Sequence, residues 1–160
     1  MKQGLWLLIT LLAALTLQVT VLDFFRVAGV KPDLVLIVII FNSFLQGSKN
    51  GALWGFAAGF LVDISTGCYF GLNALTLAAA GYLAGEAKTG LYLNSGIRVA
   101  TITLAVSLAA GVFQYLLLTF SGVFISPWLA LVGIIIPGAV YNTVVALLIK
   151  LFYHPKMLFD

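Results

Sequence analysis

Six long apolar stretches occupy most of this chain, and only short polar or glycine-containing breaks separate them. Hydrophobic residues make up 62% of the 160 residues and charged residues only 8%, so a soluble domain of this size would have too few polar side chains to cover its surface. An apolar helix can cross a bilayer because its backbone polar groups are bonded within the segment. The sequence therefore predicts an all-α integral membrane protein, with residues 1–160 as a single membrane domain.

The first half of the chain predicts short and closely connected helices. Residues 33–87 supply 55 residues, whereas three ordinary spans need about 60 residues plus turns. We therefore expect short helices joined by minimal turns, or partly re-entrant segments, with consecutive helices antiparallel and adjacent. The expected spans form a compact six-transmembrane-helix bundle: residues 5–22, 34–46, 51–66, 72–87, 99–120 and 128–149.

The basic residues predict the orientation of this bundle. With six spans, two of the eight basic residues, Arg26 and Lys31, lie on one side of the membrane. The other six share the opposite side: Lys2, Lys49, Lys88, Arg98, Lys150 and Lys156. Because basic residues concentrate on the cytoplasmic side, both termini are expected in the cytoplasm. We interpret the net charge of +3 as this bias and expect no nucleic-acid binding.

The stretch from Gly51 to Gly85 is rich in small residues. Gly51, Gly55 and Gly59 recur every four residues, so they lie on one face of a helix. After a turn near Gly67 and Gly71, a second run follows on a related spacing: Ala74, Ala78, Gly81 and Gly85. Small residues at this spacing let membrane helices approach closely. The stretch predicts a tight helical hairpin, and we expect its first small-residue face to receive or position partner helices.

Asp63 lies about 18 Å along the helix that begins near Gly51, toward the outer leaflet. A carboxylate in this position needs a partner, water or a proton. Three interpretations stay open. Asp63 is a hydrogen-bonded or hydrated acid near Ser65, Thr66 or Asn73, or it anchors a partner helix or lines a cavity, or it belongs to a proton relay.

Two prolines mark changes in helix geometry. Pro32 is expected at the first position of a helix, with Asp33 at the positive end of the helix dipole. The alternative for this segment is a partner contact. Pro137-Gly138 lies in the middle of the last span and predicts a kink, which is either a packing bend or a hinge or cavity wall.

The sequence offers no evident catalytic set. It contains one histidine, His154, and one cysteine, Cys68, so neither residue type can build a metal cluster. The five carboxylates form no evident acid and base pair, and hydrolase and nucleotide-binding motifs are absent. The mid-span amides Gln114 and Asn142 are typical of interhelical hydrogen bonds. We therefore expect no catalytic residue, cofactor or metal, and no enzymatic activity.

Four motifs carry a resemblance to a known family: Pro32-Asp33-Leu34, Gly51-x3-Gly55-x3-Gly59-x3-Asp63, Gly71-Leu72 and Gly81-Tyr82-Leu83-Ala84-Gly85. With these motifs, the chain resembles MreD, the bacterial rod shape-determining membrane protein. Its length, its six apolar stretches, its charged first outer loop and its short basic tail are similar to MreD as well.

The resemblance implies a non-enzymatic scaffold of the cell-elongation (rod) complex in the bacterial cytoplasmic membrane. Such a scaffold binds the single-span protein MreC and supports lateral peptidoglycan synthesis and cell shape. The assembly links MreB filaments to the RodA glycosyltransferase and its transpeptidase partner. We expect the partner interface at six residues: Gly51, Gly55, Gly59, Asp63, Pro32 and Asp33.

The resemblance also implies a fold similar to the substrate-binding components of energy-coupling-factor transporters. The alternative function is therefore the substrate-binding subunit of a small-molecule or lipid transporter. Several of those components carry an Ala-x3-Ala motif on the first span. Here Ala13 and Ala14 are adjacent, and Leu17 and Gln18 occupy the positions four residues on. This departure favours the scaffold.

Overall fold

The computed structural model describes residues 2–20, 29–67, 69–90 and 95–152. Its elements are helices: α1 (Lys2–Thr20), α2 (Leu34–Gln46), α3 (Ser48–Thr66), α4 (Leu72–Gly90), α5 (Ser95–Phe120), α6 (Pro127–Ala130), the π-helical turn η1 (Leu131–Ile135) and α7 (Ile136–Phe152). α6, η1 and α7 follow one another without a break, so the described residues contain six helical segments. The all-helical prediction is confirmed. The predictions for Cys68, Arg26, His154 and Lys156 concern positions outside the described residues.

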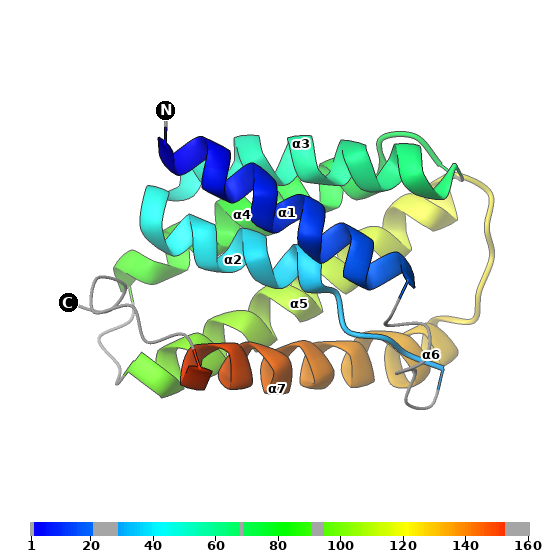
Figure 1. Ribbon diagram of the computed structural model, residues 1–160. Coiled ribbons are helices and arrows are strands. Elements are labelled where there is room, and N and C mark those ends of the chain that lie inside the picture. The colour runs from blue at the N-terminus through cyan, green and yellow to red at the C-terminus, as the bar shows by residue number, and fades with distance from the viewer. Residues whose placement is uncertain (1, 21–28, 68, 91–94, 153–160) are drawn as a thin grey trace.

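The helices form an up-and-down bundle around α2 (Figure 1). α1 begins and α7 ends at the same end of the bundle, and consecutive helices run in opposite directions. α2 contacts α1, α3, α4, α5 and α7. It is apolar over almost its whole length, as expected for a helix enclosed on all sides.

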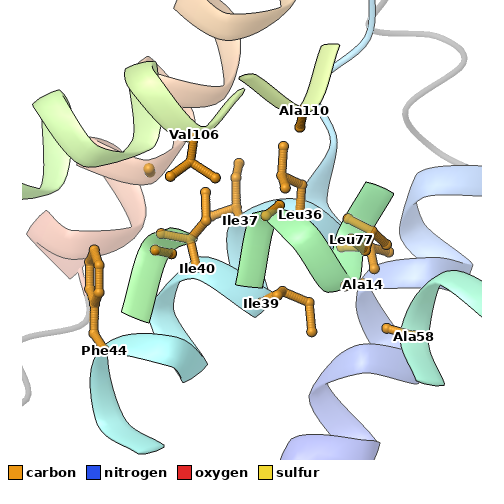
Figure 2. Close-up of a cluster of buried hydrophobic side chains, with 14 of the residues drawn as sticks. Ala14, Leu36, Ile37, Ile39, Ile40, Phe44, Ala58, Leu77, Val106 and Ala110 are labelled. Carbon is orange, nitrogen blue, oxygen red and sulfur yellow. The ribbon is translucent and has the colours of Figure 1, made fainter. Parts of the chain in front are cut away.

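The hydrophobic core surrounds α2. Ile37, Ile39 and Ile40 have no exposed surface. Figure 2 shows Ile37 directed toward Val106 of α5, whereas Ile39 points to the opposite side of α2. α2 therefore joins the α1–α3–α4 side of the bundle to the α5–α7 side.

α3 and α4 form the most extensive helix pair of the bundle. A Cβ atom added at Gly55 would overlap the carbonyl group of Leu77, and one added at Gly59 would overlap the backbone of Asn73 and Ala74. Backbone thus lies directly against backbone. The predicted tight hairpin is confirmed, and its small residues are the reason for the close approach.

A π-helical turn precedes Pro137, where the sequence predicts a kink. The Ile136 N–H donates to the carbonyl of Leu131, five residues back. Pro137 has no N–H and its ring crowds the preceding turn, so the regular hydrogen-bond pattern cannot continue through this point.

Two helical segments are long and apolar enough to cross a membrane, Gly96–Phe120 and Pro127–Phe152, and two shorter ones are apolar, Gly4–Thr20 and Leu34–Gln46. The outer surface carries many large apolar side chains, among them Leu53, Phe60 and Leu148. These features indicate a membrane protein. The number of crossings and the sidedness stay predictions.

Candidate functional site

A cavity of about 460 Å³ opens at the end of the bundle where α1, α3 and α5 end and where α2 and α4 begin. Segments that are distant in sequence contribute to its wall, including α1, the residues before α2, α4, α5 and α7. Its volume falls within the range of small-molecule binding sites, about 300–1,000 Å³. We take this cavity and the polar groups around it as the candidate site.

Asp63 caps α4 from across the hairpin. Its Oδ2 accepts hydrogen bonds from the backbone N–H groups of Gly71 and Ala74, at 3.0 and 3.1 Å. Its Oδ1 accepts from the backbone N–H of Asn73 at 3.1 Å and from Asn73 Nδ2 at 2.9 Å. The side chain is 1% exposed. A carboxylate so placed satisfies the free N–H groups of the first turn of α4 and faces the positive end of that helix.

This arrangement confirms the interpretation of Asp63 as a hydrogen-bonded acid near Asn73. The hydroxyls of Ser65 and Thr66 donate to backbone carbonyls of α3 and not to the Asp63 carboxylate. Asp63 does not line the cavity, whereas Asn73 does. The C-terminal end of α3 is unfavourable for a carboxylate, and the α4 N-terminus offsets this effect.

Asn73 connects the Asp63 cap to the cavity wall. Gln114 of α5 donates from Nε2 to Asn73 Oδ1 at 3.3 Å, and both side chains line the cavity. The expectation of an interhelical hydrogen bond at Gln114 is confirmed. Together these contacts fix α5 against the first turn of α4.

Asp33 and Asn142 form a second polar group at the cavity. Asp33 Oδ1 accepts from the backbone N–H of Leu36 at 3.0 Å, so Asp33 is the N-cap of α2. The prediction of a helix start here is confirmed, but Pro32 precedes the N-cap and is not the first helical residue. The reason is that the Asp33 side chain caps the helix from outside it.

Asn142 of α7 connects the start of α2 to α5 through two hydrogen bonds. Its Oδ1 accepts from the backbone N–H of Asp33 at 2.7 Å, and its Nδ2 donates to Ser107 Oγ at 3.3 Å. Gln18 of α1 accepts from the backbone N–H of Val35 at 3.2 Å. The interhelical role expected for Asn142 is therefore confirmed.

The charge state of Asp33 depends on burial and on its neighbours. Burial raises the pKa of the Asp33 carboxyl above its ordinary value of 3.8. Hydrogen bonds from the Leu36 amide and the Gln18 side chain, and the positive charge of Lys31, lower it in part. Burial has the largest effect, so the net direction is upward.

Substitutions at Asp33 distinguish the contribution of its capping hydrogen bond to stability from the contribution of its charge. Asp33→Ala should lower the free energy of unfolding by about 1 kcal/mol because the α2 cap is lost, whereas Asp33→Asn keeps the cap and should change it by less than about 0.5 kcal/mol.

In the unmodified protein the folded state holds the Asp33 proton to higher pH than the unfolded chain does. Its stability should therefore fall as the pH rises through this raised pKa. Unfolding in mixed micelles from pH 4 to 8 should show this fall, and the same fall in the Asp33→Asn variant would contradict the assignment.

The structure separates the six residues expected at a partner interface. Gly55 and Gly59 face α4 inside the hairpin, and Asp63 caps α4. Gly51 lies against both α2 and α4. In this structure α4 fills the small-residue face, so a partner helix would have to reach α3 from another side. Pro32 is buried, and both Pro32 and Asp33 line the cavity.

Sequence reasoning considered a cavity as an alternative at Asp63 and at Pro137 but did not locate it. Thr76, Ser107 and Tyr115 contribute to its wall and were not singled out, and Lys31 was considered only for the orientation of the bundle. The available signal was that several expected apolar spans each carry polar residues toward the same end of the bundle. Pro137 itself does not line the cavity, whereas Ile135 and Gly138, which lie before and after it in the same helical segment, do.

Comparison with known proteins gives one family. The family model described as rod shape-determining protein MreD matches residues 1–159. No curated protein and no solved structure matches the chain.

Proposed function

Because this chain belongs to the MreD family of rod shape-determining proteins, we propose that it is a non-enzymatic scaffold of the bacterial cell-elongation complex. In this proposal it binds MreC and, directly or through MreC, MreB, RodA and the transpeptidase partner of RodA. It thereby supports lateral peptidoglycan synthesis. The observation that carries the proposal is the family match over residues 1–159.

The proposed scaffold lies in the cytoplasmic membrane with six crossings and both termini in the cytoplasm. The bundle supports this topology because α1 begins and α7 ends at the same end. The distribution of basic residues, six against two, supports the cytoplasmic assignment of that end. The cavity would then open toward the extracytoplasmic side.

We place the contact with the MreC helix on the outward face of α3. The opposite face is filled by α4, which holds α3 in a fixed position. Phe56 and Phe60 lie one turn apart on the outward face and are 48% and 46% exposed. Aromatic side chains are common anchors of interfaces, and packing against a partner helix would replace their contacts with lipid.

The double substitution Phe56→Ala and Phe60→Ala tests this placement. It should weaken co-purification of MreC about tenfold or more, because two aromatic anchors are removed. The matched control is Val144→Ala with Leu148→Ala, which truncates two similarly exposed side chains on α7. The control should retain MreC. Equal retention by both double variants, at equal membrane levels, would contradict the placement on α3.

A deletion strain tests the proposed function itself. Loss of this chain should convert rod-shaped cells to rounded cells, and the unmodified chain should restore the rods. Light microscopy with a fluorescent peptidoglycan label would show whether lateral incorporation is lost. Rods of normal shape after deletion would contradict the scaffold.

The cavity favours one alternative function, a substrate-binding subunit of a small-molecule or lipid transporter. The proposed similarity to energy-coupling-factor components belongs to this alternative. It predicts that the deletion strain loses uptake of a compound and keeps its shape. Transport by the chain in reconstituted vesicles would support it over the scaffold.

A further inference from the structure

We propose that the cavity binds a small, electrically neutral amphipathic molecule whose polar head carries hydroxyl or amide groups. The proposal concerns the cavity of about 460 Å³ and is independent of the scaffold function. Three features of the cavity support it: its apolar wall, its unused hydrogen-bonding groups and the balance of its charges.

The wall of the cavity is mostly apolar. Leu15, Leu118, Ile134 and Ile135 contribute to it from three different helical segments. Such a wall favours an apolar portion of a ligand, since burial of apolar surface is favourable. A purely polar ligand would leave this part of the cavity without matching contacts.

The polar groups of the wall keep hydrogen-bonding capacity of both kinds. Gln114 donates to Asn73, and no described residue donates to its Oε1. Ser107 accepts from Asn142, and its own hydroxyl proton has no acceptor among the described residues. Hydroxyl and amide groups both donate and accept. The two sites lie seven residues apart on α5, about two helical turns, so a head that carries more than one such group matches both.

The charges of the wall balance. Lys31 and Asp33 are its charged residues among those described, and they carry opposite signs when the Asp33 carboxyl is ionised. The other polar side chains of the wall are neutral. A buried ion is costly without a partner of opposite charge, and neither an anion nor a cation would find an excess here. The cavity therefore favours a neutral head.

Two glycines of the last helical segment provide a matched pair of variants. A Cβ atom at Gly138 would meet Val30 Cγ1 at 3.5 Å, across the cavity that both residues line. The Cβ atom of Gly138→Leu would thus make an ordinary van der Waals contact, and the rest of the side chain should reduce the volume of the cavity. A Cβ atom at Gly133 would meet nothing within 4 Å, so Gly133→Leu adds the same bulk on the outside. Val30→Phe fills the same space from the opposite wall.

The experiment uses the full chain in phosphatidylcholine nanodiscs, with thermal unfolding as readout. The probes share an eight-carbon tail: neutral 1-monooctanoylglycerol, anionic octanoate and cationic octylammonium. Saturating monooctanoylglycerol should raise Tm by about 5–10 °C, and the charged probes should have much smaller effects. Gly133→Leu should keep this response, and Gly138→Leu and Val30→Phe should lose it.

Three results would overturn the proposal. The first is no rise of Tm with the neutral probe. The second is an equal rise with all three probes, which would indicate partition into the bilayer. The third is an equal rise in the unmodified protein and in whichever cavity-filling variant keeps the unmodified Tm without probe. Co-purification of MreC is measured separately, so failure of the ligand proposal and failure of the scaffold can be told apart.

Discussion

Asp63→Ala is expected to lower the free energy of unfolding by about 3–5 kcal/mol. The substitution removes the acceptor for the backbone N–H groups of Gly71, Asn73 and Ala74. These donors belong to the first turn of α4 or to the turn before it, and Asp63 is 1% exposed, so water cannot easily replace the carboxylate. Each buried donor left without a partner costs about 1–3 kcal/mol, and the effects are not fully additive.

Two further variants make the Asp63 prediction specific. Asp63→Asn keeps one acceptor oxygen and should lose about half as much stability as Asp63→Ala. Ser65→Ala removes an exposed hydroxyl that donates to the carbonyl of Leu61, and should change stability by less than about 0.5 kcal/mol. Reversible unfolding in mixed detergent micelles gives all three values. A loss of under about 1 kcal/mol for Asp63→Ala would contradict the capping role.

The hairpin could be predicted from the sequence because its cause is local. Gly51, Gly55 and Gly59 repeat with the helical period, and the second run of small residues follows after one turn. Close backbone packing needs no other information. Which helix would occupy the small-residue face was a separate question. The next helix along the chain, α4, occupies it. A face filled within the chain looks the same in sequence as a face kept for a partner.

The partners of Asp63 were only partly predictable. Asn73 was among the expected neighbours, but the backbone donors lie eight to eleven residues further along the chain. Their approach depends on the path of the turn between α3 and α4, which no helical period encodes. The predicted position of Pro32 was wrong for a similar local reason. The Asp33 side chain caps α2, so the proline lies outside the helix.

The cavity depends on non-local packing. Its wall combines residues as distant as Gln18 and Asn142, and its volume depends on how far α5 and α7 lie from the other helices. Polar residues in apolar spans were visible in the sequence. Their assembly into one site was not, because each makes a hydrogen bond that an isolated interhelical contact would also explain.

Gly55→Ala is expected to lower the free energy of unfolding by about 1–3 kcal/mol, and Gly55→Leu by more. The new Cβ atom would overlap the carbonyl of Leu77, which is backbone and cannot rotate away, so α3 and α4 must separate. This loss should appear although alanine raises intrinsic helix propensity by about 1 kcal/mol relative to glycine. Gly59→Ala should behave in the same way, since its Cβ would overlap the backbone of Asn73.

Gly133→Ala is the matched control for the hairpin, because its Cβ would meet nothing within 4 Å. It should leave stability unchanged or raise it by up to about 1 kcal/mol. Mixed-micelle unfolding again gives the values, and equal effects at Gly55 and Gly133 would contradict the packing argument. The comparison also decides how partner binding should be tested. If Gly55 variants open the hairpin, their loss of MreC would reflect a displaced α3, whereas the Phe56 and Phe60 variants alter the outward face and leave the glycine contacts in place.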